Sequence, residues 1–197
     1  LVTKVYVDDV TKYTDTSKFP KSEFHKILSD DVNVWNAEDF TYADITLDSN
    51  NSPAPAQDNM NIITGNIHVV SGLTDSGKAK LANNKNLVVP VVDEDGHKVQ
   101  GVGNSAFKGL SLESVELPKN VKAPSNGLWD SSVTTRGDFF IGASAFQGNN
   151  LTELTVPEGT IYIGSNAFSK NKLKSARFPS TLMMIGNGAV SYTHLRA

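Results

Sequence analysis

Four segments of this chain carry one six-residue pattern, Val/Ile-Gly-x-x-Ala-Phe or a close relative of it, and the last three recur at a fixed interval. The copies begin at Val102, Ile141, Ile163 and Ile185. Their glycines are separated by 39, 22 and 22 residues, and the final position holds Phe107, Phe146 and Phe168 before it becomes Val190. Self-similarity at a period of about 20 to 29 residues predicts a row of similar units, each packed against the next.

A second pattern keeps the same spacing, so the whole unit repeats. Three leucines each lie six residues before a proline, in the pairs Leu112 and Pro118, Leu151 and Pro157, and Leu173 and Pro179. Pro157 and Pro179 each lie six positions before the isoleucine that begins the next copy, Ile163 or Ile185. Pro118, in contrast, lies 23 positions before Ile141. One repeat therefore carries a 17-residue insertion within residues 119–140.

Each unit predicts two short strands and a turn. Residues 151–156 mix apolar and polar side chains before Pro157, which suits a half-buried strand that the proline ends. Residues 161–163 predict a second strand that ends at Gly164, where we expect the chain to need the conformational freedom of glycine.

The turn residues predict the contacts between units. Ala167 beside Phe168 allows a close inward turn, and the equivalent phenylalanines are expected to stack as a row of aromatic rings. Asn149 and Asn171 occupy one equivalent position. Whether they form a side-chain ladder to the backbone stays open, because Leu110 replaces them in the first copy.

The two patterns together, Leu-x-x-Val/Leu-x-x-Pro followed by Ile-Gly-x-x-Ala-Phe, resemble the BspA-like leucine-rich repeats of bacterial secreted and surface-attached proteins. The resemblance covers residues 87–190, and a weaker similarity lies in residues 35–42, 71–73 and 85–90. It implies a mainly β solenoid, a leucine-rich-repeat-like right-handed coil of about 22-residue repeats with short strands, and a small α+β N-terminal cap. It implies no catalytic site, because the family has no fixed set of functional residues to carry over.

We expect three parts along the chain. Residues 1–86 form an N-terminal segment and cap with a polar loop at about 47–57, and residues 87–190 form the repeats. Residues 191–197 fit no part of the unit. We expect them to be a truncated or non-native end, the alternative being a cap, because an open end of a repeat stack normally requires a purpose-built cover.

Three local elements are predicted outside the repeats. Ser22 is expected to cap a short helix through Leu28, and residues 62–70 are expected to form a strand. Thr74 or Asp75 is expected to cap a brief helix that ends at Leu81.

Composition is that of an ordinary folded domain and excludes two classes of partner. With 39% hydrophobic and 20% charged residues, the chain can bury a core as a monomer. A net charge of -3 without a run of basic residues excludes a nucleic-acid binder. The most apolar run, residues 87–92, is interrupted by Pro90 and too short to span a membrane. Any leader peptide is expected to have been removed or to lie outside this sequence.

Patterns that suggest catalysis or a metal are incomplete. Residues 72–79 match the phosphate-binding-loop pattern Gly-x4-Gly-Lys-Ser/Thr except at the last position. Ala79 stands where a Ser or Thr hydroxyl would bind magnesium. Residues 93–96 favour an Asp-Gly hairpin turn over a calcium loop. There is no cysteine, and the four histidines lack paired zinc spacing. They are His25, His68, His97 and His194. We predict a protein without catalytic residues, cofactor or metal.

The insertion and the exposed strand positions supply the candidate binding residues. Trp129 either anchors a ligand or packs back onto the adjacent unit, and the second interpretation is favoured. Arg136 and Asp138 belong to an Arg-Gly-Asp tripeptide, which integrin ligands display, but a tripeptide is a weak signal. The polar strand positions that we expect at the surface are Glu153, Thr155, Lys174 and Arg177.

We therefore expect an extracellular or cell-surface repeat domain that binds a protein or glycan ligand on host cells, matrix or neighbouring cells. This step from fold to function is analogy. The alternative is a structural spacer that displays another domain and has no ligand of its own. A contiguous aromatic or polar concavity favours binding, and uniformly solvated faces favour the spacer.

Overall fold

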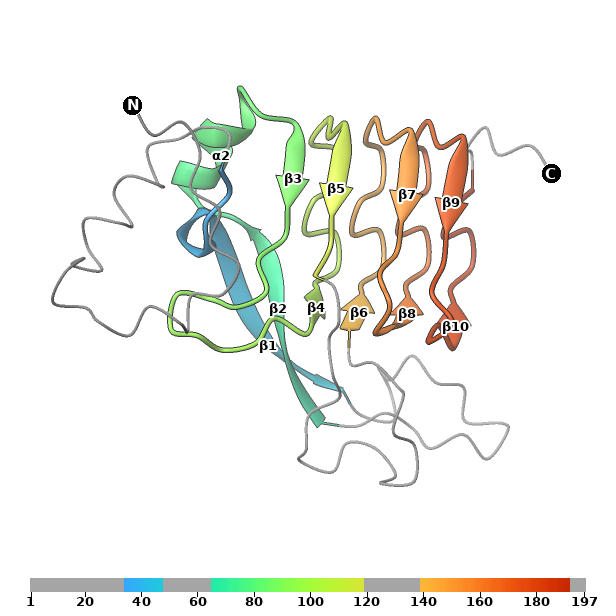
Figure 1. Ribbon diagram of the computed structural model, residues 1–197, viewed down its shortest axis with the longest axis horizontal. Coiled ribbons are helices and arrows are strands. Elements are labelled where there is room, and N and C mark those ends of the chain that lie inside the picture. Colours follow the sequence, from blue (N-terminus) through green and yellow to red (C-terminus); the bar gives the residue numbers. More distant parts are fainter. Residues whose placement is uncertain (1–33, 48–64, 119–138, 192–197) are drawn as a thin grey trace, which may run out of the picture. The chain divides into compact units, whose positions relative to one another are not determined.

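The computed structural model describes residues 34–47, 65–118 and 139–191 (Figure 1). From Trp35 onward these residues belong to one compact unit. The predicted helix after Ser22, most of the polar loop and the insertion, and all but the first residue of the tail lie outside the described residues. Within the described ranges, no helix combines the length and the apolar character that a bilayer crossing requires.

The larger sheet is open and has six strands in the order β1-β2-β4-β6-β8-β10. Their bounds are Phe40–Leu47, Gly65–Leu73, Gly101–Val102, Phe139–Ile141, Thr160–Ile163 and Met184–Ile185. Strands β1 and β2 are antiparallel, and every later pairing is parallel. Val102, Ile141, Ile163 and Ile185 pair in one register across four strands. The structure thus places equivalent residues of consecutive repeats side by side, as the spacing predicts.

A second set of short strands lies along the repeats (Figure 1). Their bounds are β3 Asn86–Val88, β5 Ser114–Glu116, β7 Glu153–Thr155 and β9 Ser175–Arg177. Parallel pairs form between β3 and β5 and between β7 and β9, and β5 lies beside β7. The strand predicted for residues 151–156 is confirmed, although only its central residues pair.

The core between the two sets of strands contains a row of aromatic rings. Phe107, Phe146 and Phe168 are fully buried. Their rings stack with centroids 5.4 Å apart for the first pair and 5.3 Å for the second. Phe40 of β1 meets Phe107 edge to face at 6.1 Å and extends the row into the N-terminal elements. The predicted stack of equivalent phenylalanines is confirmed.

The asparagine ladder is also present. The amide NH₂ of Asn149 and of Asn171 each donates to the carbonyl oxygens of two consecutive phenylalanines of the aromatic row, at 2.8 to 2.9 Å. Asn149 Oδ1 accepts from the backbone N–H of Leu110 and Leu112 at 3.0 Å, and Asn171 Oδ1 accepts from that of Leu151 at 3.1 Å. Each side chain therefore joins two repeats and satisfies backbone groups inside the core.

The predicted reason for Gly164 is wrong. This glycine is not among the residues with a positive φ, so the turn needs no left-handed conformation there. A Cβ atom at Gly164 would instead lie 2.4 Å from the backbone nitrogen of Ala143 and 2.5 Å from the carbonyl carbon of Gly142. The glycine is required because the backbone of the preceding repeat approaches too closely for any side chain.

Two residues at the last described repeat differ from their equivalents. Phe178 is 40% exposed, whereas the equivalent Val156 is 3% exposed. Ile185 is 48% exposed, whereas the equivalent Ile163 is fully buried. The sequence pattern predicts inward positions for both, but no later strand in the described part of the chain pairs with β9 or β10 to cover them.

Helix α2, Asp75–Leu81, confirms the predicted element, and Thr74 is its N-cap. The Thr74 hydroxyl accepts the backbone N–H of Gly77 at 3.2 Å. Asp39 is the last residue of the short 3₁₀ helix η2, Ala37–Asp39. A Cβ atom at Gly77 would lie 2.1 Å from the carbonyl oxygen of Asp39. A buried ion pair between Lys80 and Asp39 joins the same two elements. Gly77, the second glycine of the phosphate-loop-like pattern, therefore allows η2 and α2 to pack closely.

Candidate functional site

The outward side of β3, β5, β7 and β9 forms a continuous exposed surface, which we call the strand face. The first and third residue of each strand are exposed. These residues are Asn86, Val88, Ser114, Glu116, Glu153, Thr155, Ser175 and Arg177. Seven of these eight side chains are polar, and none is aromatic.

Charge changes sign along the strand face. Glu116 of β5 and Glu153 of β7 are acidic, whereas Arg177 of β9 and the preceding Lys174 are basic, and all four are exposed. In the parallel register Glu153 faces Ser175 and Thr155 faces Arg177. Of the predicted surface positions, Glu153 and Thr155 therefore lie on β7, Arg177 lies on the neighbouring β9, and Lys174 directly precedes β9. Trp129, Arg136 and Asp138 lie outside the described residues.

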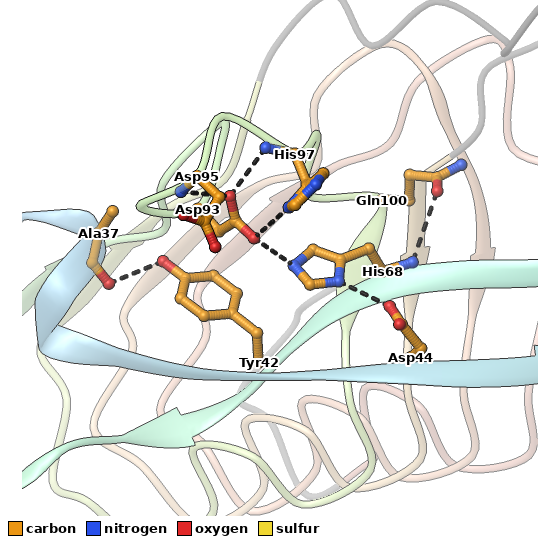
Figure 2. Close-up of polar contacts among 8 residues, drawn as sticks. All are labelled: Ala37, Tyr42, Asp44, His68, Asp93, Asp95, His97 and Gln100. Carbon is orange, nitrogen blue, oxygen red and sulfur yellow. Dashed lines mark hydrogen bonds and ion pairs between the residues drawn. The ribbon is translucent and has the colours of Figure 1, made fainter.

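A second polar group lies at the junction of β1, β2 and the turn before β4 (Figure 2). We call Asp44, His68, Asp93, Asp95 and His97 the histidine–aspartate cluster. Asp44 and His68 are paired across β1 and β2, and the hairpin turn supplies the other three. The rings of His68 and His97 lie 5.9 Å apart between centroids. Sequence spacing did not predict this meeting of two histidines 29 positions apart.

The hairpin turn is organised by Asp93. Its Oδ1 accepts the backbone N–H groups of Asp95 and His97 at 2.9 and 2.8 Å. Val92 bridges to Lys98, and Gly96 has a φ of 88°, which confirms the predicted Asp-Gly hairpin turn. Because the turn uses Oδ1, the second oxygen of Asp93 is left to meet the two imidazoles.

Both histidine rings contact Oδ2 of Asp93. His97 Nδ1 lies 2.9 Å from it and forms a hydrogen bond. His68 Nε2 lies 3.1 Å from it, within ion-pair distance, but makes no hydrogen bond. We treat that contact as electrostatic, because an N···O distance alone does not establish a directed bond. Nδ1 of His68 hydrogen-bonds Asp44 Oδ1 at 2.7 Å (Figure 2).

The orientation of the His68 ring is fixed from two sides. Tyr42 stacks on it with centroids 5.4 Å apart and an interplanar angle of 10°. The Tyr42 hydroxyl donates to the carbonyl oxygen of Ala37 at 2.7 Å, which holds the phenol in place. The backbone N–H of Gln100 donates to the carbonyl oxygen of His68 at 2.7 Å and ties β2 to the segment that follows the turn.

The electrostatics of the cluster favour a positive charge. Burial acts to raise the pKa of Asp93, but hydrogen bonds from the His97 ring and backbone outweigh it and hold that pKa below its ordinary value. The same side-chain hydrogen bond raises the pKa of His97. Burial, followed by the Asp93 charge, raises the pKa of Tyr42, so its phenol stays protonated. Three aspartates thus surround two imidazoles.

Comparison with protein families identifies the repeats. The family model described as BspA type leucine rich repeat region matches residues 60–136 and 139–197, with six copies. No curated protein matches the chain. No solved structure matches it.

Proposed function

Because this chain belongs to the BspA-type leucine-rich repeat family, we propose that its repeats wind as a right-handed solenoid whose strand face binds a protein partner. The β1–β2 hairpin and α2 act as the N-terminal cap of this solenoid. The domain works in the extracellular space or at a bacterial cell surface, as an adhesion-type module that contacts host, matrix or neighbouring cells. The location and the partner rest on the character of the family.

The single observation that carries the binding proposal is the contiguous polar strand face. Its outward positions are acidic on β5 and β7 and basic at β9, which suits a partner whose charges are arranged in the complementary order. Sugar-binding surfaces use aromatic side chains as stacking platforms, and the outward positions of the four described strands have none. A protein ligand therefore fits this surface better than a glycan.

The proposal predicts that reversing one charge on the strand face weakens binding. We expect Arg177→Glu to reduce affinity by at least about tenfold, because an unfavourable charge contact at an interface costs more than about 1.4 kcal/mol. Binding is measured first on an array of purified host matrix proteins and glycans, and then by titration of the strongest protein hit. Lys108→Glu is the matched control, since Lys108 is also exposed but lies in the turn away from the strand face.

Three results oppose the proposal. An array without signal at high micromolar concentration favours the spacer function. A signal confined to glycans assigns the surface to sugars. Equal loss of affinity in Arg177→Glu and Lys108→Glu shows that overall charge, and not the strand face, governs binding.

A further inference from the structure

Within the histidine–aspartate cluster, Asp93, Asp95 and His97 lie close enough to share one metal ion, and His68 contacts Asp93 from β2. The oxygen and nitrogen atoms of the cluster meet at Asp93, whose Oδ2 lies 2.9 Å from His97 Nδ1 and 3.1 Å from His68 Nε2 (Figure 2). Ligand atoms of Asp93, Asp95 and His97 all lie within 4.8 Å of one another. The residues come from β2 and the hairpin turn, so folding assembles the group.

A neutral His68 ring that donates to Asp44 has a lone pair on the side that faces Asp93. A carboxylate only accepts hydrogen bonds, so the 2.7 Å contact between Asp44 Oδ1 and His68 Nδ1 places a proton on Nδ1. In the neutral imidazole, Nε2 is then an acceptor. This atom is shielded from solvent and makes no hydrogen bond. Nε2 lies 3.1 Å from Asp93 Oδ2, and a proton on Nε2 or a metal ion near both atoms makes this approach favourable.

The two contacts at Asp93 Oδ2 are a few tenths of an ångström shorter than the spacing of ligand atoms around one metal ion. In a tetrahedral zinc site with bonds of about 2.0 to 2.1 Å, neighbouring ligand atoms are about 3.3 Å apart. The distances from Asp93 Oδ2 to the two imidazole nitrogens are 2.9 and 3.1 Å. An ion bonded to His68 Nε2 and Asp93 Oδ2 must lie off the line that joins them, which agrees with the missing hydrogen bond along that line.

We propose that this cluster is a binding site for a divalent transition-metal ion of the zinc class, with His68 Nε2, Asp93, Asp95 and His97 as its ligands. The His97 ring binds through Nδ1 after its proton moves to Nε2. Its side chain is 68% exposed, so the ring has room to turn and close the site once its hydrogen bond to Asp93 is released. Asp44 holds the His68 tautomer from outside the site, as carboxylates do behind metal-bound histidines.

The ligand types select the metal. Imidazole nitrogens suit zinc, copper and nickel, whereas calcium and magnesium prefer a shell of oxygen atoms. Two carboxylates with two imidazoles make four ligands, the number that structural zinc sites use. Because the ligands join β2 to the hairpin turn, a bound ion fastens the turn at residues 91–99 onto the N-terminal hairpin.

The test is a Zn²⁺ titration of the full chain after treatment with a chelator, followed by isothermal calorimetry. We expect one ion per chain, a dissociation constant in the low micromolar range or below, and a rise in melting temperature that Mg²⁺ and Ca²⁺ do not produce. His97→Ala and Asp95→Asn are expected to weaken binding by more than about tenfold, and Asp44→Asn by about 10- to 100-fold. His97 and Asp95 are exposed, so these two variants keep the fold.

The double variant His25→Ala/His194→Ala is the control, because it removes the chain's other two histidines and leaves the cluster intact. Its Zn²⁺ affinity is expected to match that of the unaltered chain. The ¹⁵N chemical shift of His68 Nε2 gives an independent signal, since it moves when the lone pair binds the ion. Failure of the unaltered chain to bind Zn²⁺, undiminished affinity in His97→Ala, or a proton on His68 Nε2 at saturating Zn²⁺ overturns the proposal.

Discussion

Replacement of Phe146 by alanine is expected to lower the free energy of unfolding by about 3 to 5 kcal/mol. The ring is fully buried between Phe107 and Phe168, with stacked neighbours at 5.4 and 5.3 Å. Removing it loses the transfer free energy of the side chain and leaves a cavity whose two walls belong to different repeats. The substitution also removes the two ring contacts of Phe146, and an aromatic pair of this kind contributes about 0.5 to 1.5 kcal/mol to stability. Urea unfolding followed by circular dichroism measures the change.

Phe178→Ala is the matched control for this experiment. The side chain is the same, but Phe178 is 40% exposed at the last described repeat. We expect a loss below about 1 kcal/mol, because much of this ring is already in contact with water. Similar losses in both variants contradict the stacked aromatic row.

Gly164→Ala is expected to destabilise the protein by about 3 kcal/mol, at the upper end of the cost of overpacking. The added methyl group would lie 2.4 Å from the Ala143 nitrogen and 2.5 Å from the Gly142 carbonyl carbon. Both are backbone atoms of the preceding repeat, so no side-chain rotation relieves the contact. The two repeats must separate locally, and the melting temperature falls with the unfolding free energy.

Gly103→Ala tests the same motif position where the preceding element is β2 instead of another repeat. There the nearest atom to an added Cβ is the Val70 carbonyl oxygen at 3.3 Å, which requires an adjustment of only a few tenths of an ångström. We expect a loss below about 1 kcal/mol. Equal losses at Gly103 and Gly164 contradict the account in which stacking of repeats, and not the turn itself, requires the glycine.

The repeat unit could be predicted from the sequence because equivalent apolar residues of adjacent units pack against one another. A residue such as Ile163 packs against Ile141 and Ile185, which occupy the same position of adjacent units. The 22-residue period therefore fixes which residues pair between neighbouring strands. The inward position of Phe168 follows from the same period. The sequence does not decide the asparagine ladder, because Leu110 occupies the equivalent position of the first copy. Asn149 donates to Phe107 and accepts from Leu110 itself, so the first repeat needs no asparagine of its own.

The features that the sequence did not predict depend on contacts without a period. The sequence alone does not tell whether a left-handed turn or a close backbone approach requires the glycine at position 164. The structure shows the close approach. His68 and His97 meet because β2 pairs with β4, and the hairpin turn before β4 returns the chain to β2. The sequence signal that was available is the Asp-Gly turn at residues 93–96, which fixes Asp93 and His97 on one side of a hairpin.

The strand face and the histidine–aspartate cluster are separate features with separate tests. Arg177 lies on β9, whereas the cluster lies at the N-terminal end of the repeat row, beside β1 and β2 (Figure 1). A variant of the cluster that loses zinc is expected to keep the exposed side chains of β7 and β9 unchanged. Loss of one activity with retention of the other is therefore the outcome we expect from variants at either place.

The most direct test of the stacked repeats uses a cysteine pair, because the chain has no cysteine of its own. Glu153 and Ser175 are exposed register partners on β7 and β9, 22 positions apart. Neighbouring strands are about 4.8 Å apart, within the about 4.4 to 6.8 Å that a disulfide spans between Cα atoms. The control pair, Glu153→Cys with Arg177→Cys, is shifted by two residues to about 8 Å and lies beyond that reach.

Under mild oxidation we expect a disulfide in Glu153→Cys/Ser175→Cys and none in the control pair, scored by mass spectrometry and by mobility without reductant. Efficient crosslinking of the shifted pair, or none in the matched pair, would contradict the 22-residue register between consecutive repeats.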